Sequence, residues 1–256
     1  MGASWKSLFQ MKKWLSVLSN PESLEAPDRN FIGHRDILIR NMARYHFVAP
    51  HIHGALLEVG CGRGYGLEVL ATRSTAQVGV DFSKVFLKEA HNYLATVSFA
   101  QASGAALPFS DSSFDSIIAF DVIEHIDDDL TFLNELKRVA RNQAFIAIST
   151  PNKLIASGNG QKPLDPFHAR EYTSTEFYSL LNKVFPLVEL FGQYETPGDA
   201  ISGLMDRIPT RWKYLVPLSI QGIISVALRP PLRLEECRFE SKNLEDAHTF
   251  IAVCRL

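Results

Sequence analysis

A short glycine-rich stretch constrains this chain more than any other. Residues 55–66 read ALLEVGCGRGYG, in which an apolar run ends at Glu58 and glycines follow at every second position from Gly60 to Gly66. Glycine tolerates positive φ, and its missing Cβ lets a ligand approach the backbone. Such a turn after a buried strand is typical of an open α/β sheet that binds a ligand beyond the carboxyl ends of its strands.

The remaining sequence alternates strand-like and helix-like segments. Such alternation favours right-handed crossovers and a doubly wound α/β fold. We predict a seven-stranded, mostly parallel sheet with an antiparallel last strand. The predicted strands lie at about 55–60, 77–83, 97–103, within 114–126, and at 144–150, 187–195 and 248–256.

Two segments outside this pattern are predicted to be helical additions. Residues 1–50 are expected to form an N-terminal helical cover on a domain of residues 51–256, with a late insertion at about 199–240. Residues 1–20 are amphipathic and contain Trp5 and Trp14, so they either pack on the domain or make a peripheral membrane contact. The insertion mixes apolar groups with arginines such as Arg207. It forms either a further helical layer or a surface for an amphiphilic acceptor or an anionic bilayer.

Composition excludes several classes of protein. The chain has 256 residues, 46% hydrophobic residues and a formal charge of −2, as expected for a soluble protein that does not bind nucleic acid. Cys61, Cys237 and Cys254 form no CxxC pair, which argues against a zinc-thiolate site or a disulfide framework. We therefore expect a cytoplasmic protein, without a secretory signal or a membrane-spanning helix.

The glycine spacing separates two kinds of cofactor site. A dinucleotide-binding loop requires G-x-G-x-x-G, and Tyr65 occupies the third glycine position counted from Gly60. The arrangement Glu58-x-Gly60-x-Gly62-x-Gly64 instead resembles the first motif of class I S-adenosylmethionine-dependent methyltransferases of the small-molecule type. The resemblance covers about residues 50–195 and the last strand. It implies a Rossmann-like fold and S-adenosylmethionine as cofactor.

The same resemblance assigns roles around the loop. The loop would wrap the methionine and ribose of the cofactor, Asp81 would accept both ribose hydroxyls, and Phe82 would pack beside the adenine. Ser103 stands where the family usually has an acid, so only an uncharged acceptor is offered to the adenine amino group. The candidate cofactor-binding residues are Glu58, Gly60, Cys61, Gly62, Gly64, Asp81, Phe82, Ser103, Gly104, Ala105, Asp121 and Val122.

Two histidines are candidate catalytic residues. His125 follows the fourth strand, and His168 lies in DPFHAREY, which resembles an active-site segment of many small-molecule methyltransferases. An imidazole suits a general base, because its pKa is near neutral. For each histidine a structural role is the alternative. The acidic run Asp127–Asp129 precedes a helix, so we expect it to cap that helix and predict no metal site.

The function implied is methyl transfer from S-adenosylmethionine to a small-molecule acceptor. A hydroxyl is the expected target, on a compound that could be a saccharide or lipid-linked. The alternative is a non-catalytic S-adenosylmethionine-binding module that regulates or scaffolds a partner.

Overall fold

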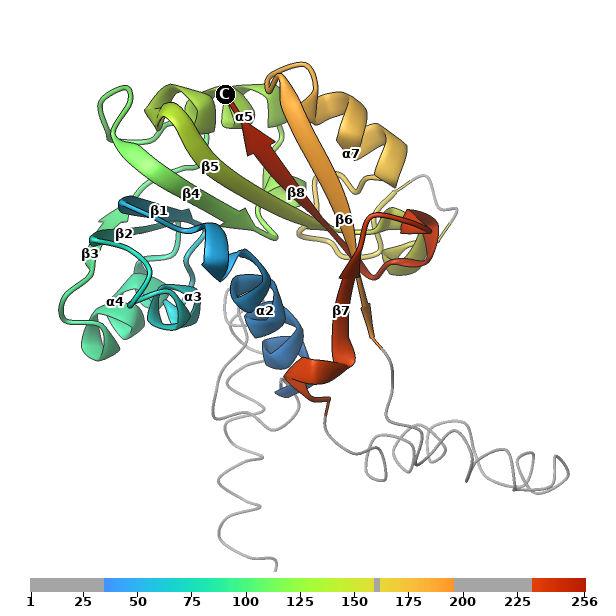
Figure 1. The fold of residues 1–256 in the computed structure, drawn as a ribbon, viewed down its shortest axis with the longest axis horizontal. Helices are drawn as coiled ribbons and strands as arrows, with labels where there is room; N and C mark the ends of the chain where they lie inside the picture. Colours follow the sequence, from blue (N-terminus) through green and yellow to red (C-terminus); the bar gives the residue numbers. More distant parts are fainter. Residues whose placement is uncertain (1–34, 159–161, 196–231) are drawn as a thin grey trace, which may run out of the picture.

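The computed structural model describes residues 35–158, 162–195 and 232–256, and every structural statement below concerns these residues. They form one eight-stranded sheet in the order β3-β2-β1-β4-β5-β8-β6-β7 (Figure 1). The strands are β1 (Ala55–Val59), β2 (Ala76–Asp81), β3 (Ser98–Gln101), β4 (Phe114–Phe120), β5 (Ala140–Pro151), β6 (Leu187–Glu195), β7 (Cys237–Glu240) and β8 (Thr249–Arg255).

The predicted α/β class and the antiparallel last strand are confirmed, but the strand count is corrected from seven to eight. Strands β1–β6 run in one direction, and β8 inserts antiparallel between β5 and β6. The additional strand, β7, pairs antiparallel with Gly192–Glu195 at the sheet edge. It lies at the end of the predicted helical insertion. Four residues with alternating burial are too short to reveal a strand by periodicity.

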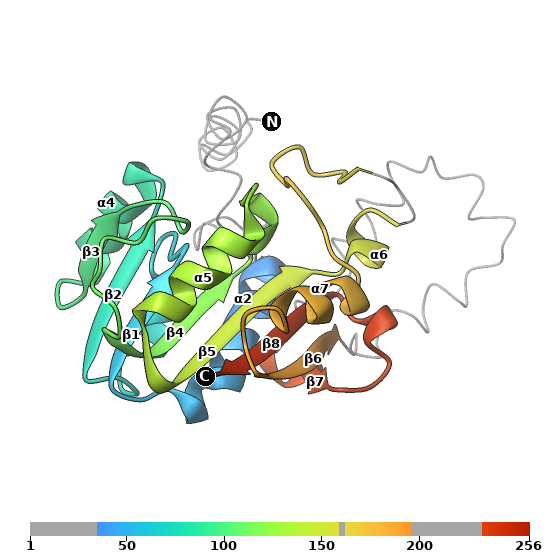
Figure 2. The same ribbon diagram turned by 90° about the horizontal axis from the view of Figure 1, so that it is seen from above.

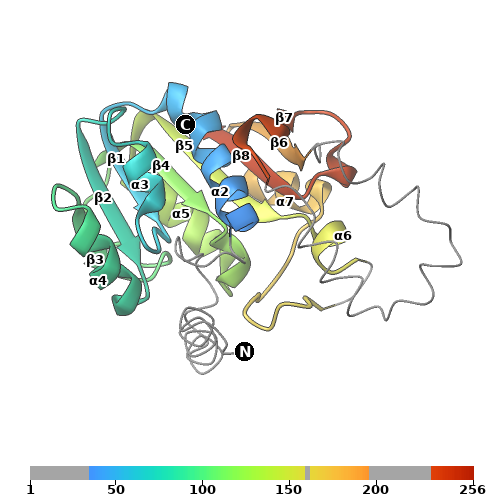
Figure 3. The same cartoon turned by 90° about the horizontal axis from the view of Figure 1, so that it is seen from below.

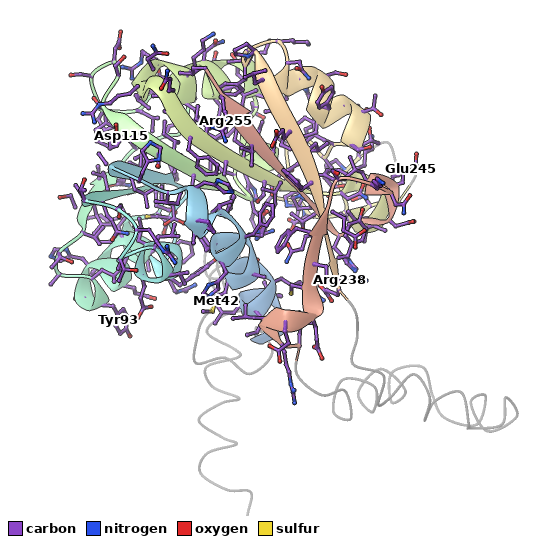
Figure 4. The ribbon with its side chains drawn as sticks, in the orientation of Figure 1. Met42, Tyr93, Asp115, Arg238, Glu245 and Arg255 are labelled. Carbon is purple, nitrogen blue, oxygen red and sulfur yellow. The ribbon has the colours of Figure 1, made fainter. Side chains whose placement is uncertain are left out.

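Helices cover both faces of the sheet. One face carries α5 (Asp129–Val139) and α7 (Ser174–Leu181), which lie across it in Figure 2. The other carries α2 (Arg35–Val48) and α3 (Tyr65–Val69), which lie in front of the sheet in Figure 3. Helix α4 (Lys84–Tyr93) packs beside β2 and β3, with Tyr93 at the outer edge (Figure 4). Two buried apolar clusters, one on each side of the sheet, form the core.

Short elements connect these layers. The four-residue helix α6 (Lys153–Ala156) follows β5. Four 3-10 turns are η3 (Ala49–His51), η4 (Ile123–His125), η5 (Leu234–Glu236) and η6 (Leu244–Asp246). No helix within the described ranges combines the length and apolarity needed to cross a bilayer.

Helix α2 is the described part of the predicted N-terminal cover. It packs on β7 and η5, and the Phe47 ring stacks on Phe239 with centroids 4.4 Å apart. Figure 4 labels Met42 on α2 and Arg238 on β7. The backbone carbonyl of Arg40 also accepts a hydrogen bond of 2.9 Å from Gln193 in β6. The predicted helix at 1–20 and residues 199–231 of the insertion lie outside the described residues.

Local signals set the helix starts as predicted. Asp128 caps α5, because its carboxylate accepts a 3.0 Å hydrogen bond from the Thr131 backbone N–H. Thr173 and Glu176 form a capping box at α7. The expected capping role of the acidic run is therefore confirmed at Asp128.

Candidate functional site

A cleft of about 730 Å³ opens where β1, β2 and β4 end. This is the edge at which parallel α/β sheets bind ligands, near the point where the strand order reverses at β1. Ten of the predicted site residues line it: Gly60, Gly62, Asp81, Phe82, Ser103, Gly104, Ala105, Asp121, Val122 and His125. The structure thus gathers residues that are spread over sixty-six positions of the sequence.

The glycine-rich loop is tied closely to the end of β2. The backbone N–H groups of Gly60 and Cys61 both donate to the Val80 carbonyl, at 2.7 and 3.0 Å. Gly60 has φ +72°, and a Cβ there would lie 2.3 Å from Cγ2 of Val122. Only glycine combines this backbone conformation with such close packing, so Gly60 fixes the approach of the loop to β4.

Asp81 connects this loop to the start of α4. Its Oδ2 accepts a 2.7 Å hydrogen bond from the Gly62 N–H, and its Oδ1 accepts one of the same length from the Ser83 N–H. Burial raises the pKa of Asp81, while these two N–H groups lower it. The carboxylate lines the cleft with its remaining lone pairs available to a ligand.

Asp121 at the end of β4 is held by a buried arginine. Arg44 of α2 donates to both oxygens of Asp121, at 3.1 and 2.5 Å, and the Ser149 hydroxyl donates to Oδ1 at 2.8 Å. Burial lowers the pKa of Arg44, but the adjacent Asp121 carboxylate raises it overall. Asp121 has φ +52°, an uncommon conformation for a residue with a side chain. The pair therefore orients a strained residue at the cleft wall.

Three of the predicted cofactor-binding residues, Glu58, Cys61 and Gly64, do not line the cleft. Glu58 is buried and accepts a hydrogen bond from the Tyr45 hydroxyl of α2. Burial raises the pKa of Glu58 to about 8. Cys61 is buried as well, and Gly64 faces Leu94 and Ala90 of the α4 region. Direct cofactor contacts by these three residues stay a prediction.

The loop after β3 forms another wall of the cleft. The Ser103 hydroxyl accepts a 3.2 Å hydrogen bond from the Ala105 N–H, which leaves a lone pair and a proton for a ligand. A Cβ on Gly104 would lie 2.8 Å from the Phe132 ring, so this glycine is required by core packing. Phe82 is 79% exposed at the rim. Its ring offers an apolar face to a planar group.

The two candidate histidines lie side by side. Their rings pack edge to face with centroids 4.9 Å apart. His125 lines the cleft, and its Nδ1 is 3.0 Å from the Phe167 carbonyl oxygen. His168 does not line the cleft, and its Nδ1 is 2.9 Å from Oε1 of the buried Glu171. Carbonyl oxygens only accept hydrogen bonds, so Nδ1 of His125 carries the proton and its Nε2 retains a lone pair when the ring is neutral.

Charge around the cleft is strongly one-sided. Four aspartates line it, namely Asp81, Asp121, Asp127 and Asp128, and no lysine or arginine occurs among the lining residues that the structure describes. An acidic, partly apolar cleft favours a ligand that carries positive charge and a flat ring.

Sequence reasoning missed the partners of these residues. Arg44 and Tyr45 of α2 contact Asp121 and Glu58, and Glu171 contacts His168. Arg44 and Tyr45 lie far in sequence from the residues that they contact, and only the fold brings them together. Glu171 alone gave a local signal, because it stands three residues after His168 in DPFHAREY.

A glycine-rich loop after β1, an acid at the tip of β2 and an acidic cleft at the reversal of strand order define a nucleoside-binding α/β protein. A family model described as a methyltransferase domain matches residues 57–148, which contain the loop and most of the cleft. Residues 57–148 thus resemble methyltransferase domains. The similar proteins and solved structures include several named S-adenosylmethionine-dependent methyltransferases.

Known proteins resemble the chain over about half of its length. A probable S-adenosylmethionine-dependent methyltransferase of Mycobacterium tuberculosis is 35% identical over 143 residues, 56% of this chain and 52% of that protein. A ubiquinone biosynthesis O-methyltransferase of Parvibaculum lavamentivorans is 27% identical over 146 residues, 53% and 58% of the two chains. The chain thus spans about half the length of the curated relatives it matches.

Solved structures resemble the fold as a whole. The structure of an S-adenosylmethionine-dependent methyltransferase from Thermotoga maritima matches with a TM-score of 0.61 at 17% identity, over 87% of this chain and 94% of that chain. At this identity the match concerns the fold.

Proposed function

We propose that the chain transfers a methyl group from S-adenosylmethionine to a hydroxyl of a small-molecule acceptor. The observation that carries the proposal is the position of His125. Its ring stands in the cofactor cleft with Asp121 and Val122, and His168 backs it. A base at this end of the cleft can take the acceptor proton before transfer.

The cleft fits the cofactor in charge and shape. S-adenosylmethionine supplies an electrophilic methyl group on a positively charged sulfur. Asp81, Asp127 and Asp128 favour that charge, whereas Arg44 already balances the charge of Asp121. Asp81 can accept hydrogen bonds from ribose hydroxyls, and the exposed Phe82 ring can cover the adenine. Ser103 offers a hydroxyl to the adenine edge in place of a carboxylate.

The remaining residues position the acceptor. Arg44 holds Asp121, and the Phe167 carbonyl and Glu171 hold the two imidazoles in fixed orientations. Fixed groups around the nucleophile supply much of the rate in a displacement, because alignment and exclusion of water lower the barrier. Three relatives are named O-methyltransferases, which supports oxygen as the methylated atom. Saccharides and lipid-linked compounds are the acceptor classes to test first.

The test is mass spectrometry of acceptor panels and cell extracts incubated with the full chain and isotopically labelled S-adenosylmethionine. Wild type should label a hydroxyl compound. His125→Ala should lower turnover at least tenfold and leave cofactor affinity unchanged, whereas His91→Ala, an exposed histidine on α4, should behave as wild type. Tight cofactor binding without labelling of any compound would refute the proposal and favour a binding module.

A further inference from the structure

A buried carboxylate beside the two histidines has no role in the cleft wall. Glu124 is fully buried, and neither of its carboxylate oxygens has a hydrogen bond of good geometry among the described residues. Burial raises the pKa of Glu124 well above its usual value, and the neighbouring Thr150 hydroxyl and Arg44 guanidinium lower it by less. An unpartnered buried carboxylate is costly unless it is protonated or meets a positive charge. One ligand atom each from Glu124, His125 and His168 lie within 4.8 Å of one another.

Both imidazoles make the outer hydrogen bond that metal-bound histidines usually make. A ligating histidine usually donates its other ring N–H to a carbonyl or carboxylate, which fixes the tautomer. Here Nδ1 of His125 meets the Phe167 carbonyl at 3.0 Å, and Nδ1 of His168 meets Glu171 at 2.9 Å. Nε2 of His168 is 3.8 Å from Asp165, too far for a hydrogen bond. Both Nε2 atoms are therefore left to bind a cation.

Backbone contacts also fix the two segments that supply these groups. The Glu124 carbonyl accepts hydrogen bonds from the N–H groups of Ala169 and Arg170, at 2.8 and 3.1 Å. These bonds clamp the loop of His168 onto η4, which carries Glu124 and His125. Bonds of about 2.1 Å from nitrogen and oxygen to a metal bring neighbouring ligand atoms to roughly 3–3.5 Å, so shifts of about 1 Å would close the set.

We propose that Glu124, His125 and His168 bind a divalent transition cation, such as Zn²⁺ or Mn²⁺, at the acceptor end of the cleft. Two imidazoles and one carboxylate suit these metals better than Mg²⁺ or Ca²⁺, which prefer oxygen ligands. The exposed His125 lines the cleft, so a cation held by this cluster would lie next to the space in which an acceptor binds.

This inference rests on the proposed methyl transfer and refines its acid–base step. A hydroxyl bound to the cation loses its proton to water more readily, and the O–H electron pair stays on the oxygen that accepts the methyl group. In this refinement His125 is a ligand, and water in place of His125 takes the acceptor proton, because a nitrogen bonded to a cation cannot take a proton. The sequence prediction of no metal considered the acidic run and could not see the pairing of His125 with His168.

The test is titration of the chelator-stripped full chain with Co²⁺, followed by visible absorption, and with Zn²⁺ by calorimetry. Wild type should bind one ion per chain with the intense absorption of a low-coordinate Co²⁺ site. Glu124→Gln and His168→Ala should weaken binding at least tenfold, and Glu171→Gln, which removes a positioning residue, by 10–100-fold. His91→Ala should bind as wild type.

Failure of this inference is distinguishable from failure of the proposed function. The metal site is overturned if wild type does not bind one ion per chain. It is also overturned if Glu124→Gln, His168→Ala and Glu171→Gln bind the ion as tightly as wild type does. Full methyl transfer in the presence of chelator also overturns the metal site, but it leaves the proposed methyltransferase function intact. One-to-one binding at the cluster without labelling of any acceptor supports the site and overturns the transferase.

Discussion

The Arg44–Asp121 pair predicts an asymmetric response to loss of each partner. Asp121→Asn removes the negative charge and keeps a residue type that tolerates the left-handed backbone at φ +52°. It leaves the charged Arg44, whose side chain is 3% exposed, without a counter-charge. Stranding a buried charge costs about 3 kcal/mol or more. Arg44→Met instead leaves Asp121 32% exposed and still bonded to Ser149, so water can solvate it at a cost of about 1 kcal/mol.

Thermal unfolding at pH 7 measures both changes. For a chain of this size we expect Tm to fall by about 6–12 °C for Asp121→Asn and by about 2–4 °C for Arg44→Met. The double variant should resemble Arg44→Met, because the stranded charge is gone. If Asp121→Asn costs no more than Arg44→Met, or if the two losses simply add, the buried-charge argument is wrong.

Two further predictions concern Glu58, which is buried below the cleft, and Gly60, which lines it. Since the folded pKa of Glu58 is about 8 and its unfolded value is near 4.5, its contribution to stability is full below about pH 4.5 and is lost as pH rises through 8. The free energy of unfolding of Glu58→Gln should therefore rise relative to that of wild type, by up to ~1 kcal/mol per pH unit between pH 5 and 8, as measured by urea unfolding. Parallel pH profiles of the two proteins would contradict this. Gly60→Ala should lose about 2–4 kcal/mol and most cofactor affinity, from its positive φ and the clash with Val122. Gly158→Ala, at φ +62° in open space, should lose only about 1 kcal/mol, and equal losses in the two variants would exclude the clash.

The sequence predicted those parts of the fold that depend on local pattern. The alternation of strands with helices and the cap at Asp128 follow from residues a few positions apart. Strand β7 was missed, because four residues at a sheet edge carry too little periodicity.

The residues that line the cleft were predicted from motifs, but the residues that hold them in place were not predicted. Each motif residue at a strand end could be placed at the cleft because parallel strands present their carboxyl ends at one edge. Arg44, Tyr45 and Glu124 act through contacts set by packing, and hydrophobic pattern gives no sign of such partners. Glu58 and Cys61 also belong to the motif, but both are buried and do not line the cleft, so their contacts with the cofactor stay a prediction.

The central claim is that the cleft binds S-adenosylmethionine with Asp81 holding its ribose, and titration calorimetry of the full chain with S-adenosylmethionine tests it most directly. We predict one site per chain and a loss of about 1.5–3 kcal/mol, roughly 10–150-fold in Kd, for Asp81→Ala. Asp111→Ala is the matched control, because this exposed carboxylate pairs with Arg138 at the far end of α5 and should not change the affinity. No binding by wild type, or equal affinity for wild type and Asp81→Ala, would contradict the account.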